Sequence, residues 1–302
     1  MCRRTKYFLL ALALVGCDVK TETDLAICKK NLELVFRDEF NVNRLDTLNW
    51  RNYSSSPAPF DRILPRGNCD FRNAAIIDNN NLVVEDGVLN LIAKAENKTY
   101  EGVVGGENGK ALGCNLVGGE SFIFEQNFTT ASVFSRKGYQ NGLFECRARI
   151  PSAKGLYPVF WLWHHDEIVV FEFFGDSNVH FVSAHNKEKY VTKKFSNSNY
   201  SGDFHSYAVY WDNENITWFY DESIIWKICR DELLLSGLCK SSDEPDNHNF
   251  KINESFPDST NRWLSPNVSL RIYEWDESLD VDNLPDTLVV DHVSVYQSLS
   301  SF

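Results

Sequence analysis

Beyond residue 31, hydrophobic residues come in short runs, many of which alternate apolar with polar positions. The runs are rich in Val, Ile, Phe, Tyr and Trp, which favour strands. They predict strands at Gly142–Pro151, Leu156–His164, Glu167–Phe174, Val179–His185, Phe204–Trp211, Ile216–Tyr220, Val268–Trp275 and Leu288–Tyr296. Asp221–Ser223 is predicted to be a hairpin turn. One helical turn, at Asp231–Leu235, is the only helix expected. For 302 residues the pattern predicts an all-β fold of two packed sheets.

Two segments are predicted to be loops. Residues 97–120 are rich in Gly and Asn, and residues 236–262 are mostly polar. Such composition favours turns and irregular backbone over strands. Neither segment is long enough for a second domain.

The N-terminus has the organisation of an export signal. Basic residues precede a short apolar run at 7–15, which is too short to span a bilayer. The run ends in Leu14–Cys17, which resembles a bacterial lipobox. That resemblance implies a signal peptide at 1–16, cleavage before Cys17 and acylation of its thiol. An ordinary secretory signal that happens to contain Cys is the alternative.

The lipobox predicts an exported lipoprotein held at a membrane. Residues 17–30 would carry the lipid and act as a polar tether. Residues 31–302 would form the folded domain, which we expect to be a monomer.

The net charge limits the classes of partner, and the cysteines bear on disulfide formation. The net charge is −12 and the pI is near 5.1, which argues against nucleic acid as a partner. Clustered sulfates on a substrate would be disfavoured too, unless the binding site is locally basic. Of the eight cysteines, Cys2 leaves with the signal and Cys17 would carry the lipid, so six remain and their pairing is open. Cys229 and Cys239 are the favoured bridge, and Cys146 is expected to be a buried free thiol.

The chemistry is concentrated in Asp166–Gly175, which contains two glutamates. Glu167 and Val169 share one face of a strand, because alternate residues do. Glu172 joins them only if a β-bulge near Val170–Phe171 inserts one extra residue. Two carboxyls about 5–5.5 Å apart are what a retaining glycosidase needs. Two unrelated surface glutamates are the alternative.

Several motifs, in order along the chain, resemble glycoside hydrolase family 16, which includes laminarinases, agarases and carrageenases. The central strand resembles its Glu-x-Asp-x-x-Glu signature. The other similar segments are Phe36–Phe40, Leu45–Trp50, Val83–Leu89, Phe128–Ser132, Gly142–Pro151, Gly155–Trp163, Phe204–Trp211 and Val290–Tyr296. The resemblance implies a β-jelly-roll sandwich of two curved antiparallel sheets with an open substrate cleft.

Position by position, the resemblance makes Glu167 the nucleophile and Glu172 the acid/base. The family's central Asp falls on Val169, which cannot hydrogen-bond the nucleophile. The apolar neighbour is expected to raise the pKa of Glu167, and the lost charge to lower that of Glu172. Losing such a supporting group typically costs about 10²–10⁴ in rate. His185 is a candidate to compensate.

Four residues are candidates for substrate binding. Trp161 and Trp163 would stack on sugar rings, although core packing explains a Trp equally well. Arg136 resembles a family position that often holds a basic residue near the cleft. His185, on the next predicted strand, would hydrogen-bond the substrate or Glu172, although a lone His is more often structural.

The resemblance also implies a structural calcium ion on the convex face, with ligands at Glu39, Gly87 and Asp291. Oxygen ligands suit that ion. The alternative is that Asp291 caps a strand without metal. No cofactor is required for the chemistry.

Two functions follow. The first is a retaining, endo-acting hydrolase of internal β-glycosidic bonds in a polysaccharide, with a β-1,3-glucan favoured. The second is a lipid-anchored carbohydrate-binding protein whose catalysis is impaired by Val169.

Overall fold

The computed structural model describes residues 22–52, 65–66, 70–71, 76–103, 121–164, 166–186, 189–196, 200–230, 243, 245–247, 251–257, 263–272 and 279–298. Several predictions lie outside these ranges: the signal at 1–16, Cys17, the helical turn at Asp231–Leu235, and Cys69, Cys114 and Cys239. No described helix is long and apolar enough to cross a membrane.

The larger of two packed sheets, the back sheet, has ten strands. Its order is β17 (Ser223–Cys229), β16 (Asn215–Tyr220), β15 (His205–Trp211), β10 (Gly142–Arg149), β19 (Asp286–Gln297), β7 (Val88–Val103), β8 (Ser121–Thr130) and β5 (Ile76–Ile77). Strand β1 (Glu33–Asp38) pairs with β19, and β6 (Leu82–Glu85) pairs with β7. All pairs are antiparallel except β5–β8.

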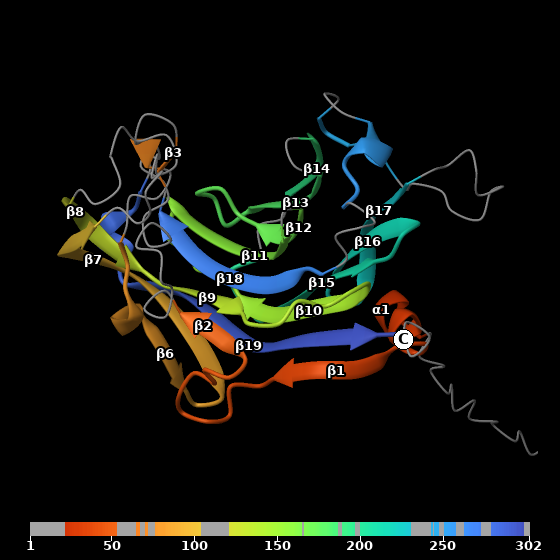
Figure 1. The fold of residues 1–302 in the computed structure, drawn as a ribbon, viewed down its shortest axis with the longest axis horizontal. Coiled ribbons are helices and arrows are strands. Elements are labelled where there is room, and N and C mark those ends of the chain that lie inside the picture. The colour runs from red at the N-terminus through yellow and green to blue at the C-terminus, as the bar shows by residue number, and fades with distance from the viewer. Residues whose placement is uncertain are drawn as a thin grey trace, which may run out of the picture.

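The smaller sheet, the concave sheet, has seven strands, all paired antiparallel. Its order is β14 (Lys189–Ser196), β13 (Val179–Asn186), β12 (Asp166–Glu172), β11 (Leu156–His164), β18 (Ser265–Ile272), β9 (Ser132–Ser135) and β2 (Trp50–Asn52). It curves over the back sheet, with its outer face concave (Figure 1). The two sheets confirm the predicted all-β sandwich.

The remaining elements are small. β3 (Pro65–Arg66) pairs with β4 (Asp70–Phe71). The helix α1 spans Asp24–Lys29, and 3₁₀ helices span Asn79–Asn81, Ile252–Glu254 and Val281–Asn283. The turn predicted at Asp221–Ser223 joins β16 to β17, and Asp221 adopts a φ of 51° there.

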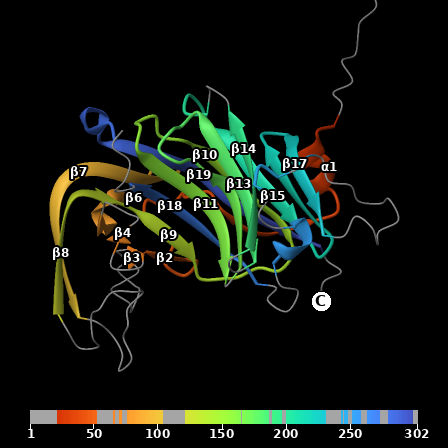
Figure 2. The ribbon, with the colours of Figure 1, turned by 90° about the horizontal axis from the view of Figure 1, so that it is seen from above.

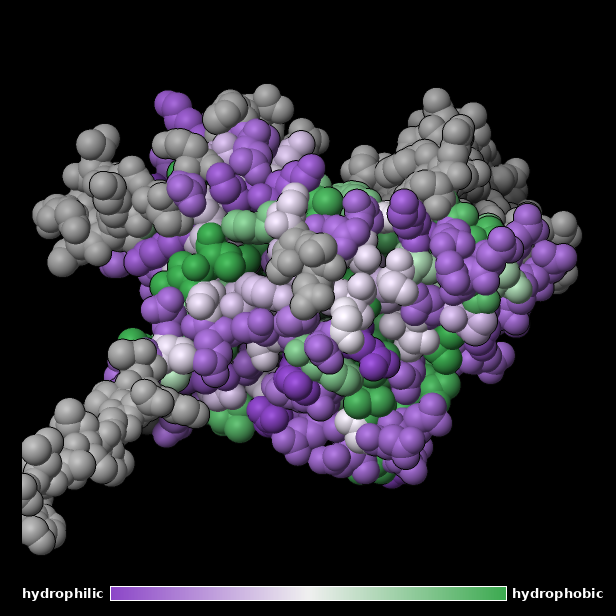
Figure 3. All heavy atoms as spheres, turned by 180° about the vertical axis from the view of Figure 1, so that it is seen from behind, coloured by the Kyte–Doolittle hydropathy of each residue, from purple (hydrophilic) through white to green (hydrophobic). Residues whose placement is uncertain are grey.

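The core lies between the two sheets, because alternate residues of each strand face inward. Phe144 of the back sheet and Phe160 and Phe171 of the concave sheet are fully buried members of one cluster. Hydrophilic side chains cover most of the described surface seen from behind, and the hydrophobic ones form separate patches (Figure 3). The strands therefore sort their side chains as the alternation predicts.

Two expectations need correction. Residues 97–103 are not loop but the end of β7, which pairs with β8 up to Val103↔Ser121. These strands form a long curved hairpin at one end of the molecule (Figure 2). The Gly- and Asn-rich composition misled because cross-strand pairing outweighs local propensity.

The tether expected at 17–30 is wrong for residues 24–30. Thr23 caps α1 by accepting a hydrogen bond from the backbone N–H of Ala26. Leu25 is buried, and Lys29 Nζ lies 2.8 Å from a carboxylate oxygen of Glu145 on β10. An apolar anchor and a partly buried ion pair therefore hold this segment on the back sheet.

The cysteines behave partly as expected. Cys146 is a buried free thiol, as predicted, and burial raises its pKa well above the usual value. Cys28 on α1 is also free. Cys229 is disulfide-bonded, which agrees with its half of the favoured bridge.

Candidate active site

The predicted β-bulge in β12 is confirmed. Phe160 of β11 pairs with Phe171, but its neighbour Trp161 pairs with Val169, so Val170 is the extra residue. The same shift occurs against β13 between Val169 and Glu172. The inserted residue turns Glu172 back to the face of the strand on which Glu167 lies. Glu167, Val169 and Glu172 therefore share the concave face.

Strand pairing places a row of side chains on this face, because directly paired residues point to the same side. The row through Val169 contains Thr192, Ser183, Val169, Trp161, Asn267, Phe134 and Arg51, one from each strand. In the next row, Glu167 lies between His185 and Trp163. On the other side, Glu172 lies between Phe181 and Val159.

Two core side chains hold the carbonyls of the bulge. The indole N–H of Trp218, on β16, donates a 2.8 Å hydrogen bond to the carbonyl of Val169. Nε2 of the buried His180 lies 3.4 Å from the carbonyl of Val170. A bulge leaves backbone groups without a ladder partner, and a buried carbonyl needs one. Trp218 of the back sheet and His180 of β13 in the concave sheet thus support the register on which the glutamates depend.

Burial raises the pKa of both glutamates. The pKa of Glu167 rises to about 7 and that of Glu172 to about 8, while the positive charge of Arg271 opposes both shifts. The increase at Glu167 agrees with the prediction. The lowering expected at Glu172 was relative to a family site with Asp at position 169 and stays a prediction, while desolvation sets the raised value found here.

Val169 is part of a hydrophobic cluster on the concave face. It is 1% exposed and packs with Tyr157, Val159, Trp161 and the half-buried Phe134. The side chain at the centre of the signature therefore supplies packing instead of a carboxylate, and both glutamates border an apolar surface.

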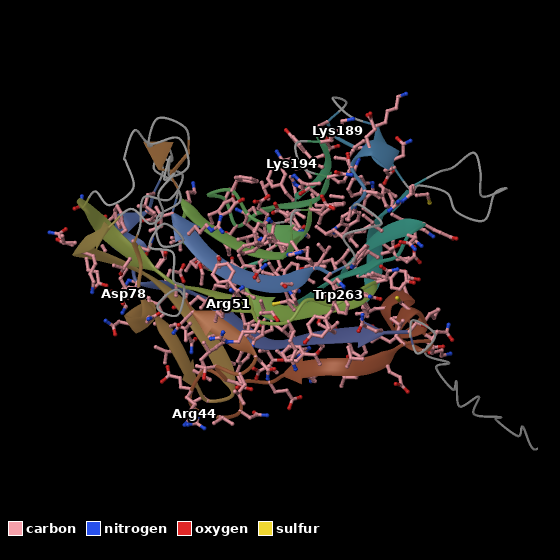
Figure 4. All side chains as sticks on the ribbon, in the orientation of Figure 1. Arg44, Arg51, Asp78, Lys189, Lys194 and Trp263 are labelled. Carbon is pink, nitrogen blue, oxygen red and sulfur yellow. The ribbon has the colours of Figure 1, made fainter. Side chains whose placement is uncertain are left out.

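The two candidate tryptophans differ in accessibility. Trp161 is 7% exposed, and its ring meets that of Phe134 edge-on at 5.9 Å. Trp163, at the end of β11, is 54% exposed and pairs with Glu167. Trp163 is thus the more accessible platform for a sugar ring beside the candidate nucleophile. Trp263, just before β18, is equally exposed (Figure 4).

His185 lies in the strand position opposite Glu167, as the sequence predicts for a site residue. Its Nε2 is 2.7 Å from the Ser183 hydroxyl, and its ring stacks on Tyr190. Burial lowers its pKa to about 4. The imidazole is therefore neutral near pH 7, so it does not replace the charge of the missing carboxylate.

Arg136 has a structural role here. Its Nε donates to the carbonyls of Thr47 and Trp50 at 2.8 and 3.2 Å. It lies just beyond β9 and ties the segment before β2 to that strand. These contacts engage its Nε with backbone carbonyls next to β9, which lies three places from β12 in the sheet order.

Arg271 is the site residue that sequence reasoning missed. It lies on the concave face of β18, opposite Tyr157, and its guanidinium lies over the ring of Trp161, 5.0 Å from the centroid. It is the only charged residue of β18. A basic residue on the polar face of a predicted strand was the available signal, but only the strand order shows that it reaches the glutamates.

The carboxylates expected to bind calcium have other partners. Glu39 accepts hydrogen bonds from Arg37 and Asn41. Asp291 lies 2.7 Å from His292 and 3.3 Å from Arg147, which lower its pKa despite partial burial. A calcium ion would have to displace these partners. The described residues contain no group of three or more His, Cys, Asp or Glu suited to a metal, and calcium stays a prediction.

Comparison with known proteins gives consistent relatives. A beta-glucanase of Rhodothermus marinus is 25% identical over 323 residues, covering 98% of this chain and 95% of the relative. A glucan endo-1,3-beta-glucosidase A1 of Niallia circulans is 24% identical over 309 residues. That match covers 92% of this chain but only 39% of the relative's length.

A solved structure shows the same fold. The laminarinase from Flavobacterium sp. UMI-01 superimposes with a TM-score of 0.60 at 20% identity, covering 88% of this chain and all of that one. The family model for glycosyl hydrolases family 16 matches residues 75–237, which include both candidate glutamates and more than half of the chain. The chain therefore belongs to glycosyl hydrolase family 16, a family of enzymes that act on O-glycosyl bonds.

Proposed function

We propose that this protein is a retaining, endo-acting hydrolase of β-glycosidic bonds in a polysaccharide, with Glu167 as nucleophile and Glu172 as acid/base. The observation that carries the proposal is the bulge at Val170, which places both glutamates on the concave face of one strand. A β-1,3-glucan is the favoured backbone, because the relatives include glucan endo-1,3-beta-glucosidase A1.

The order of the two pKa values suits these roles. In the first step, the carboxylate of Glu167 attacks the anomeric carbon while Glu172 gives its proton to the departing oxygen. In the second step, Glu172 takes a proton from the water that breaks the glycosyl–enzyme bond. With pKa values of about 7 and about 8, Glu167 is the first of the two to ionise. The nucleophile is then charged while the acid keeps its proton.

The shape of the sheet supports internal cleavage. The concave face follows the whole width of the seven-stranded sheet. Exposed aromatic rings at Trp163 and Trp263 offer stacking surfaces along it. A long face of this kind suits a polymer that extends past the glutamates in both directions.

The test is hydrolysis of β-glucans and algal galactans by purified protein, followed as new reducing ends. Glu167→Ala should abolish cleavage. Glu214→Gln, which removes an exposed carboxyl before β16, should keep it. NMR of the first products should show the β anomer. Inversion at the anomeric carbon would overturn the retaining mechanism, and wild-type cleavage that survives Glu167→Ala would overturn the assignment. Binding without cleavage by wild type would leave the carbohydrate-binding function instead.

The lipid anchor at Cys17 also stays a prediction. Mass spectrometry of the mature N-terminus should find a diacylglyceryl group on wild type and none on Cys17→Ser. A mature protein that begins elsewhere would contradict it.

A further inference from the structure

The concave face has a charge balance opposite to that of the whole chain. Strand pairing places three cations on it, Arg51, Lys194 and Arg271, and two carboxyl groups, Glu167 and Glu172. The chain as a whole has a net charge of −12. Burial keeps both glutamates partly protonated near pH 7. The face is therefore locally basic on an acidic protein.

Arg271 is the cation whose charge acts on Glu167 and Glu172, and it forms no ion pair with another described residue. None of the ion pairs among the described residues involves it. Its Nε is buried without a hydrogen-bond partner in the same part of the chain. A buried donor without a partner is unfavourable. A charged side chain that forms no ion pair is available to an anionic ligand through its outer donors.

The stack on Trp161 holds the guanidinium over the face. The centroid distance of 5.0 Å is within the range of a cation–π contact. Stacking restricts the side chain and leaves the edge of the guanidinium for hydrogen bonds. That edge matches the two oxygens of a carboxylate or a sulfate group. A neutral hydroxyl would use one donor and would not match the fork of the guanidinium.

A second cation, Lys194, lies on the other side of the glutamates from Arg271, in the direction of β14. Lys194 Nζ is 5.9 Å from the centroid of Phe181, which pairs with Glu172. Lys194 is on β14 and Arg51 is on β2, at the two edges of the sheet (Figure 4). Positive charge is thus distributed along the path of a bound polymer, with Arg271 beside the glutamates.

We propose that the substrate is an anionic polysaccharide, bearing carboxylate or sulfate groups, and that Arg271 recognises one such group beside the bond that is cleaved. The inference deepens the proposed hydrolase by naming its substrate class. The inference rests on the proposed hydrolase only where cleavage is measured, because binding of an anionic polysaccharide can be measured without cleavage.

The experiment compares three β-1,3-glucans of matched length: neutral, carboxymethylated and sulfated. Binding is measured by affinity electrophoresis and cleavage by new reducing ends, for wild type, Arg271→Gln, Arg271→Lys and Arg44→Gln. Arg44 is exposed and lies on the side of the molecule away from Lys194 (Figure 4). Arg44→Gln therefore removes the same charge without touching the concave face.

Wild type and Arg44→Gln should bind at least one charged glucan tenfold or more tightly than the neutral one at low salt. Added NaCl should reduce that preference, because salt screens it. Arg271→Gln should abolish the preference and Arg271→Lys should keep part of it. The charged glucan that is preferred identifies carboxylate or sulfate as the ligand.

Equal binding of neutral and charged glucans by wild type would overturn the inference. So would an unchanged preference in Arg271→Gln, or an equal loss for all three polymers in both Arg271 variants. Thermal midpoints of the variants would separate misfolding from lost recognition. If charged glucans bind through Arg271 but none is cleaved, the hydrolase proposal fails and the recognition stands. If neutral glucan is cleaved and no charged glucan is preferred, the hydrolase proposal stands and the recognition by Arg271 fails.

Discussion

The indole N–H of Trp218 donates a 2.8 Å hydrogen bond to the carbonyl of Val169, across the interface between the two sheets. The bond reaches the one stretch of β12 where a bulge interrupts the ladder. The back sheet thereby supports the backbone that presents Glu167 and Glu172. Because the carbonyl is buried, loss of this donor should affect both stability and chemistry.

Trp218→Phe should keep an aromatic ring in the core while removing the indole N–H and part of the buried volume, a volume loss that the control variant shares. We expect a loss of about 1–3 kcal/mol in the free energy of unfolding, the usual cost of a buried acceptor without a partner. We also expect kcat to fall, because the bulge loses a support. Trp226→Phe is the matched control. It removes an indole N–H from the stacked neighbour, which donates to the carbonyl of Asp243 and not to β12. Equal kcat in the two variants would argue against a role for the bond in positioning the glutamates.

The pH dependence of activity should follow the two glutamates. Cleavage needs Glu167 ionised and Glu172 protonated, so kcat/KM should be highest between about pH 7 and 8. The two limbs belong to the interacting pair and not to one residue each. Initial rates from pH 4 to 10 on a soluble β-glucan test this. A maximum near pH 5 would show that the glutamates are less desolvated than the structure indicates.

Stability should depend on pH in the opposite sense to that of an ion-paired carboxylate. The pKa of Glu172 is about 8 in the folded protein and near 4.5 in a solvated chain. The folded state therefore holds the proton more tightly, and stability should decline as pH rises from about 4.5 to 8. Glu172→Gln cannot ionise, so its thermal midpoint should fall less over this range. Parallel midpoint curves for the two proteins would contradict the raised pKa.

Val169→Asp should restore the family's third carboxylate. We expect kcat to rise at least tenfold, because the new group supports the nucleophile and general acid–base terms of this kind are worth about 10²–10⁴. The variant should also be less stable, since Asp would replace a side chain packed against Trp161. Val169→Asn, similar in size but uncharged, is the control. A rate no higher than wild type in Val169→Asp would show that this position does not limit catalysis.

Trp163→Ala should weaken polymer binding with little effect on folding. Its side chain is 54% exposed and lies beside Glu167 in the sheet. Loss of a stacking platform should raise KM several-fold and leave the thermal midpoint close to that of wild type. Leu48→Ala, which truncates a side chain that is 83% exposed in the segment before β2, is the control. An unchanged KM would place the sugar elsewhere on the face.

Much of the fold was predictable from local patterns. Alternation located strands of both sheets, because each strand buries one side against the core; these are β10 to β13, β15, β16, β18 and β19. The bulge was predictable too, since five positions separate Glu167 from Glu172 and only an extra residue brings them to one face. The end of β7 was not, because its strand formers are mixed with Asn, Lys, Glu and Gly, and pairing with β8 decides the conformation.

The sequence by itself determined the all-β class, the family signature, the two glutamates and the valine between them. Tertiary structure decided what surrounds them. Arg271 reaches the site because β18 pairs with β11, a partner far away in the chain. Lys29 docks α1 on Glu145, 116 positions away. The pKa values of the glutamates depend on burial by several strands at once. Local sequence specifies which side a residue faces, and only long-range pairing specifies its neighbours there.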